Sequence, residues 1–255
     1  MNLRTARLMA LEALAREDHD GALRACLQGL YSAPRATELY LIKGHVLLRA
    51  DRPLEAVAAF EAALAASSGS TRIRCLLAAA RDRAGDLEGA VADYRAVLVQ
   101  EPLRVAARYN LALLLVAKED VAGAVREYQE LLRHEPLCVQ AHNNLGVLLS
   151  AQGDADGAIA CFERARRACP EDPVSALNLA REWADRGAYA RAEEALALVL
   201  ALSPEFGEAL ALAAWLHLRQ GRWVEAERSY RLAAEAGFDT PAVQEGRAIA
   251  ISSLS

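Results

Sequence analysis

The chain repeats itself every 34 residues, and this period constrains its fold more than any other feature. An alanine recurs seven times at this spacing without a single insertion, with a small residue twelve positions before it and a mostly large residue four positions after it. The alanines are Ala22, Ala56, Ala90, Ala124, Ala158, Ala192 and Ala226; the small residues are Ala10, Gly44, Ala78, Ala112, Gly146, Ala180 and Ala214; the third set is Cys26, Phe60, Tyr94, Tyr128, Phe162, Leu196 and Tyr230. Such a period indicates an array of small units, each contacting its neighbours in sequence.

Each unit is predicted to hold two helices separated by a turn. Glycine can end the first helix at Gly85, Gly153, Gly187 and Gly221. Proline at positions 34, 102, 136, 170 and 204 stops the second helix. The stretch HNNLG (142–146) places a glycine inside a helix, where it costs about 1 kcal/mol relative to alanine. Because Gly146 occupies the small position, we predict that a bulkier side chain there would push two helices apart.

The repeat resembles the tetratricopeptide repeat, most closely in HNNLGVLLSAQGDADGAIACFERARRACPED (142–172). The first unit departs most from the pattern, with Cys26 at the aromatic position, and the seventh lacks its proline. The resemblance implies an all-α, right-handed superhelical solenoid of helix-turn-helix repeats, whose first helices line a concave groove. The expected units of this single continuous domain are 3–36, 37–70, 71–104, 105–138, 139–172, 173–206 and 207–240, followed by a C-terminal capping helix over 241–255 with Gln244, Glu245 and Arg247 on its outer side.

Charge and composition exclude several function classes. The chain has 29 basic and 34 acidic residues, a net charge of −5, so it lacks the basic footprint of a nucleic-acid-binding protein. No segment approaches the 18 or more apolar residues of a membrane span, and no targeting signal stands at the start. We therefore expect a cytoplasmic protein, possibly peripheral to a membrane complex, with no direct membrane insertion. The five cysteines form no CxxC pair and are expected to be reduced and structural.

Catalytic and cofactor motifs are missing as well. The five histidines include no HExxH, no Cys/His cluster has the spacing of metal ligands, and neither GxxxxGK[ST] nor GxGxxG occurs. Cys161 and Cys169 lie eight residues apart, but two thiols alone make a poor site. We expect no enzymatic activity, no cofactor and no metal.

The resemblance also implies which side chains line the groove, namely those at the second, fifth, sixth, ninth, twelfth and thirteenth positions of each first helix. Three consecutive units place asparagine at the sixth position: Asn110, Asn144 and Asn178. An amide both donates and accepts hydrogen bonds, so this ladder could hold the backbone of an extended peptide, as similar ladders do in the superhelical domain of O-GlcNAc transferases. Alternatively, asparagine at this position simply marks the family.

Six more residues complete the predicted peptide-binding set: Ile42, Arg72, Tyr109, Asn143, Arg181 and Trp215. Trp215 falls at a ninth position, where it either contacts a partner or packs in the core. Trp183 and Trp223 fall on packing positions. The chain's two lysines, Lys43 and Lys118, do not match the carboxylate clamp of chaperone-binding members.

Two function classes stay open. The first is a non-catalytic adaptor or assembly factor that binds an extended peptide segment of a partner protein in the groove. The second is a self-assembling scaffold, associated with an organelle or a membrane complex, for which a homo-oligomer is possible. A third hypothesis is that the chain is the repeat module of a larger glycosyltransferase or secretion system.

Overall fold

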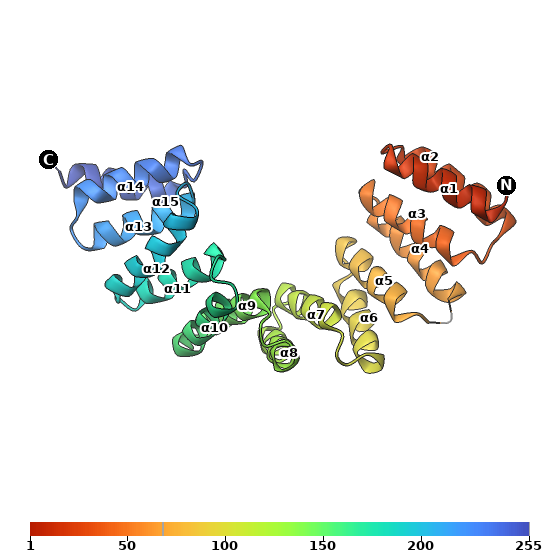
Figure 1. Cartoon of the computed structure of the whole chain (residues 1–255), viewed down its shortest axis with the longest axis horizontal. Coiled ribbons are helices and arrows are strands. Elements are labelled where there is room, and N and C mark those ends of the chain that lie inside the picture. Colours follow the sequence, from red (N-terminus) through yellow and green to blue (C-terminus); the bar gives the residue numbers. More distant parts are fainter. Residues whose placement is uncertain (68, 255) are drawn as a thin grey trace. The chain divides into compact units, whose positions relative to one another are not determined.

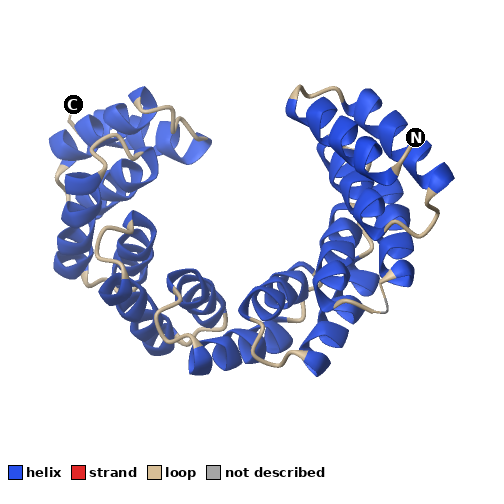
Figure 2. Ribbon diagram, turned by 45° about the vertical axis from the view of Figure 1, so that its right-hand side comes forward, coloured by secondary structure: helices blue, strands red, loops and turns tan. Residues whose placement is uncertain are grey.

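The structure is a computed structural model that describes residues 1–67 and 69–254. These residues form fifteen α-helices and no strand (Figure 2), so the predicted all-α class is confirmed. The helices group into two compact units, Met1–His134 and Glu135–Ser255, and each is described by itself. The single continuous domain expected from the sequence stays a prediction.

The first unit is a stack of four helical hairpins (Figure 1). Each first helix packs against the second helix that follows it, and each second helix packs against the next first helix. The first and second helices alternate in the order α1 (Leu3–Ala15), α2 (His19–Ser32), α3 (Thr37–Arg49), α4 (Pro53–Ala66), α5 (Thr71–Arg83), α6 (Leu87–Gln100), α7 (Val105–Ala117) and α8 (Val121–His134).

The second unit repeats the arrangement with three hairpins and a last helix that packs on α14 and α13. Its helices are α9 (Val139–Ala151), α10 (Ala155–Ala168), α11 (Pro173–Asp185), α12 (Tyr189–Leu202), α13 (Gly207–Arg219), α14 (Trp223–Glu235) and α15 (Pro241–Ser252).

One backbone turn recurs at the end of the first helix of every repeat. Its central residue has a positive φ: 61° at Glu17, 55° at Asp51, 81° at Gly85, 60° at Glu119, 82° at Gly153, 71° at Gly187 and 73° at Gly221. The following N–H donates back into the helix, as from Asp154 to the carbonyl oxygen of Leu149 at 2.9 Å. This is the C-terminal turn that left-handed backbone makes possible. The four predicted glycine turns are thus confirmed, and three repeats build the same turn on an acidic residue.

Four second helices share an N-terminal cap that the sequence reading missed. A carboxylate oxygen accepts from the backbone N–H of a glycine three residues later, at 2.8 to 3.0 Å. Such a cap satisfies one of the unpaired donors at a helix start. The pairs are Asp18–Gly21, Asp86–Gly89, Asp120–Gly123 and Asp154–Gly157.

The core forms where the small and large positions of the repeat meet. A Cβ atom on Gly146 would stand 2.5 Å from the ring of Phe162, and one on Gly44 would stand 2.5 Å from the ring of Phe60. Both rings are buried, as is Ala158. The prediction that Gly146 lies where two helices approach closely is confirmed.

The outer side of α15 is polar only in its first half. Gln244 and Glu245 are exposed, and Arg247 pairs with Glu227 of α14 at 3.1 Å. Further along the helix, Ile249 is 44% exposed and Ile251 is 50% exposed. The polar surface expected of a capping helix therefore ends before the helix does.

Candidate functional site

The first helices of unit 1 carry a cavity of about 470 Å³ between α1 and α3. Its six lining residues all stand at positions that the sequence assigned to the groove: Leu11, Leu14, Ala15, Ile42, His45 and Arg49. Ile42 is half-buried because it also packs on the core cluster that includes Ala10 and Cys26. Leucine and isoleucine side chains make the cavity apolar, and Arg49 gives it a charged edge.

Two arginines stand at or near this cavity. Arg72 and Arg49 are exposed, and neither has an ion-pair partner among the residues that the structure describes. The pKa of His45 lies below its usual range because of burial first, and then because of the nearby charges of Arg72 and Arg49. The surface therefore suits an apolar side chain followed by an acidic group.

The predicted residues of α7 face partly inward. Asn110 is half-buried, and its Nδ2 donates to the hydroxyl of Tyr94 at 3.1 Å. Tyr94 is buried, which raises the pKa of its hydroxyl to about 12, although the bond from Asn110 opposes the rise. Tyr109 is half-buried and lies edge-on to Tyr128, with ring centroids 5.9 Å apart. Asn110 thus has a structural partner at one end of its amide.

In unit 2 the neighbouring asparagines have different roles. Asn143 is 8% exposed, so the expectation that it flanks an open surface is wrong. Its Nδ2 donates to the carboxylate of Asp172 at 3.2 Å, and that carboxylate caps α11 through the N–H of Ser175. Asn143 therefore fastens α9 to the start of α11. Asn144, next to it, is half-buried and has a partner of its own.

Asn178 and Asn144 lie on adjacent first helices, since α11 contacts α9. Asn178 is half-buried. Asn110 belongs to the other unit, so the structure places only these two rungs of the predicted ladder within one body. Contact of any of the three with a peptide stays a prediction.

The late residues of the predicted set hold neighbouring helices together. Arg181 is exposed and pairs with Glu208 of α13. Trp215 is half-buried, lies edge-on to Tyr189 with centroids 6.3 Å apart, and has the guanidinium of Arg219 5.6 Å from its ring centroid. Trp215 therefore packs on one side and leaves part of its ring open, which is compatible with both of its predicted roles.

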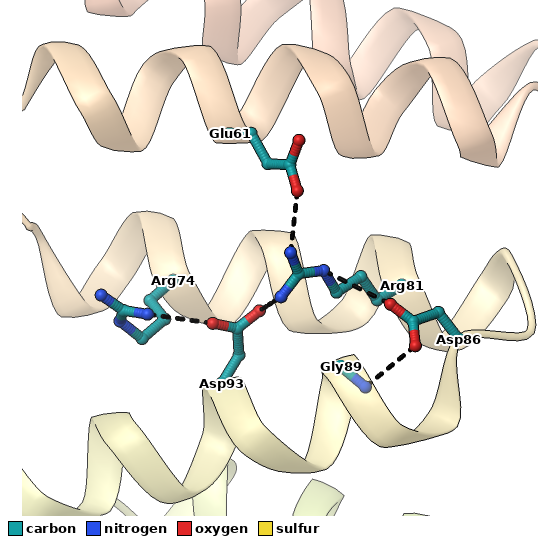
Figure 3. Close-up of polar contacts among 6 residues, drawn as sticks. All are labelled: Glu61, Arg74, Arg81, Asp86, Gly89 and Asp93. Atoms are coloured by element: carbon teal, nitrogen blue, oxygen red, sulfur yellow. Dashed lines mark hydrogen bonds and ion pairs between the residues drawn. The ribbon is translucent and has the colours of Figure 1, made fainter.

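The second-helix side of unit 1 contains the most connected charged network (Figure 3). Asp93 of α6 is 4% exposed and accepts from Arg81 at 2.5 Å and from Arg74 at 3.0 Å. Arg81 also reaches Glu61 of α4 at 2.8 Å, so its guanidinium links three helices. Arg81 also lies 3.6 Å from Asp86, so every charged group in this network has a partner of opposite charge, which fits a structural role.

The described residues contain no group of three or more His, Cys, Asp or Glu side chains that could hold a metal ion. The five cysteines are free thiols. Burial raises the pKa of Cys26 to about 11 and also raises the pKa of Cys161. A thiol that stays protonated is a poor nucleophile, so these two thiols are packing groups.

Family comparison decides the classification. Two models described as tetratricopeptide repeat match the chain, one over residues 7–71, 75–130 and 110–173, the other over 184–249. The chain belongs to the tetratricopeptide repeat family. Tetratricopeptide repeats form a protein-interaction fold, and such proteins are generally non-catalytic scaffolds that bind other proteins. No curated protein matches the chain in sequence.

Solved structures share the tetratricopeptide fold at low sequence identity. A tetratricopeptide repeat protein from Parabacteroides merdae is 19% identical, with a TM-score of 0.68 over 98% of each chain. The C-terminal part of a repeat protein from Cytophaga hutchinsonii is 12% identical, with a TM-score of 0.75 over 94% of this chain and 98% of that one. YrrB, described as having an unusual peptide-binding site, is 19% identical, with a TM-score of 0.61 over 75% and 99%.

None of the helices in the described part of the chain is both long and apolar enough to cross a membrane.

Proposed function

We propose that this protein is a non-catalytic adaptor or assembly factor that binds an extended segment of a partner protein on its first-helix face. The observation that carries the proposal is the cavity between α1 and α3, which combines an apolar interior with Arg49 at its edge and has Arg72 of α5 close to His45. An apolar side chain of the partner fills the space beside Ile42, and an acidic group of the partner meets Arg49 and Arg72. Guanidinium groups suit this task because they bind carboxylates in a fixed, two-pronged geometry.

Asparagine side chains supply the second part of the recognition. The bond from Asn110 to Tyr94 uses only the amide nitrogen, which leaves the amide oxygen to accept from a peptide N–H. Asn178 of α11, in unit 2, is half-buried, and its amide can both donate and accept hydrogen bonds. Such bonds recognise the backbone of a peptide whatever its sequence. The peptide-binding site described for YrrB supports this mode of binding for the fold.

The test compares two variants of the full chain against a purified partner. Ile42→Asp with Arg72→Glu places negative charge in and beside the cavity, so the affinity should fall by about tenfold or more. Leu54→Asp is the matched control because Leu54 is a largely exposed apolar residue of α4, a second helix outside the cavity. Equal binding by all three proteins would contradict the proposal.

A specific observation favours self-assembly as the second candidate. Met9 is 47% exposed on α1, whereas the residues at its position in repeats three to six, among them Leu77 and Leu111, are buried. Ile249 and Ile251 are likewise uncovered on α15. Both ends thus expose apolar side chains that another helix could cover. Light scattering over a hundredfold concentration range separates the candidates, since only a scaffold grows into large assemblies without a partner.

A further inference from the structure

Unit 2 contains a groove that corresponds in sequence to the site of the charged network in unit 1. The two are three 34-residue periods apart: Glu61 corresponds to Glu163, Leu77 to Leu179, Arg81 to Trp183 and Asp93 to Ala195. The acidic residue on the first wall and the leucine on the floor are therefore kept. The buried ion pair is replaced by a tryptophan and an alanine.

A cavity of about 450 Å³, here called the Trp183 groove, lies at this place. The matching place in unit 1 also has a cavity, of about 520 Å³, but its lining includes the paired Arg81 and Asp93. Its floor is α11 and its walls are α10 and α12, so all of it lies on the second-helix side of unit 2. The lining residues are Glu163, Arg166, Leu179, Trp183, Arg191, Glu194, Ala195 and Leu198. Apolar atoms of tryptophan and leucine lie beside the charged groups.

Trp183 holds guanidinium groups at its ring. Arg191 lies 4.5 Å from the ring centroid, within the range of a cation–π contact. Arg186 lies 5.7 Å from the ring centroid, but it is paired with Asp156 at 2.7 Å. Of these two arginines, Arg191 is therefore the one that lies over the ring and has no carboxylate partner among the described residues.

Hydrogen-bond donors in the groove outnumber acceptors. Within the described structure, neither Arg166 nor Arg191 forms an ion pair, and Nε of Arg166 is buried without an acceptor. Glu163 is already paired with Arg167 at 2.9 Å, so Glu194 is the one lining carboxylate that has no pair. A bound carboxylate would accept from the guanidinium groups of Arg166 and Arg191. In unit 1 the chain itself supplies an acceptor, Asp93, for two other arginines, Arg74 and Arg81.

We propose that the Trp183 groove binds a short acidic segment of a partner protein, in which an Asp or Glu stands beside a large apolar residue. The carboxylate accepts from Arg166 and Arg191. The apolar neighbour packs on Trp183 and Leu198, which is 50% exposed. This is a second site, lined by α10, α11 and α12 of unit 2, and it gives the adaptor a contact that does not depend on the cavity beside Ile42.

The experiment is a titration of the ¹⁵N-labelled full chain with two peptides, followed by NMR. The acidic probe is acetyl-Gly-Leu-Asp-Phe-Glu-Gly-amide, and its neutral match is acetyl-Gly-Leu-Asn-Phe-Gln-Gly-amide. The indole N–H signal that disappears in Trp183→Phe identifies Trp183 among the three tryptophans. The acidic probe should shift this signal saturably, and the neutral match should bind at least about tenfold more weakly.

Four variants make the result specific. The double change Arg166→Gln with Arg191→Gln should weaken the affinity for the acidic probe by about tenfold or more. The control is Arg164→Gln, at an exposed arginine of α10 outside the groove, which should change this affinity by less than about twofold. Ala195→Asp places a carboxylate of the chain in the groove, so it should abolish binding of the acidic probe. The Ile42→Asp, Arg72→Glu protein should bind the probe at Trp183 normally, which separates this site from the proposed first-helix site.

Two results would overturn the inference. One is equal shifts with the neutral peptide, or unchanged binding by the double arginine variant when its helical circular dichroism is intact. The other is a full shift of the Trp183 signal by sodium phosphate at matched ionic strength, because the groove would then select a free anion and not a protein segment.

Discussion

Gly146 lies directly against the ring of Phe162, so that a Cβ atom added to this glycine would stand 2.5 Å from Cε1 of the phenylalanine. The ring is buried and cannot move aside without disturbing the next hairpin. Gly146→Ala should therefore destabilise the protein by about 1–2 kcal/mol, since overpacking outweighs the better helix propensity of alanine. A urea unfolding curve measures the loss.

The control for that prediction is a second change at the same contact. Repeat six combines Ala180 with Leu196 at the equivalent positions, and both are buried there. Adding Phe162→Leu to Gly146→Ala should remove most of the coupling between the sites. Strictly additive effects would show that the ring does not limit the size of residue 146.

The recurring left-handed turn predicts a stabilising change. Glu119 has a φ of 60°, which is unfavourable for any residue with a Cβ atom, and four repeats use glycine at this position. Glu119→Gly should therefore stabilise the protein by about 0.5–1 kcal/mol, even after the entropy cost of glycine. Ala50→Gly, one residue before the equivalent Asp51 and at a φ of −81°, should not stabilise. The measurement is the melting temperature of each variant. An equal rise in melting temperature for both variants would contradict the account.

The charged network in unit 1 predicts an asymmetric response to mutation. Asp93→Ala leaves the guanidiniums of Arg74 and Arg81, which are both mostly buried, without their shared carboxylate. We expect a loss of about 2–4 kcal/mol for this change. Glu61→Ala removes a half-exposed carboxylate from the same arginine and should cost under about 0.5 kcal/mol. Chemical denaturation of the two variants would refute the network's structural role if their losses were equal.

Histidine burial predicts a pH dependence of stability. His142 is buried, and its Nε2 donates to the carbonyl oxygen of Pro136 at 2.9 Å. Burial lowers the pKa of His142, with a smaller opposing effect from that hydrogen bond and a further lowering from the charge of Arg164. The unfolded chain therefore takes up a proton first, so stability is full above the unfolded value of 6.5 and falls as the pH drops below it.

The measurement is the free energy of unfolding between pH 8 and pH 5, with a slope of at most about 1.4 kcal/mol per pH unit from one group. His142→Gln should flatten the fall, whereas His134→Gln, at an exposed position, serves as the control. An unchanged slope in the His142 variant would exclude this histidine as the source.

The repeat period alone was enough to predict the helix pairs and the close approach at Gly146, because both follow from residues a fixed distance apart in sequence. The four Asp–Gly caps, such as Asp154 with Gly157, recur with the same period. These caps are absent from the sequence-based predictions, because those rest on the glycine of the turn, Gly153, and not on the glycine three residues after the aspartate. The sequence period therefore contained more of the local structure than was extracted from it.

The candidate site was less predictable because its side chains depend on neighbouring helices. Asn143 stands at a groove position by count, yet its amide is buried and donates to Asp172, the last residue of the same repeat, which caps the first helix of the next one. Trp183 packs on the core as its position predicts, but the same ring also lines a groove with Arg191 of the following helix. Neither contact follows from position within a single helix.

The most direct test of the adaptor account is the affinity of a purified partner for the Ile42→Asp, Arg72→Glu protein, measured by isothermal titration calorimetry against the wild type and Leu54→Asp. The account predicts that the cavity variant loses about tenfold or more in affinity, while Leu54→Asp binds as the wild type does. Equal affinity of all three proteins would contradict it, because the cavity between α1 and α3 would then have no part in recognition.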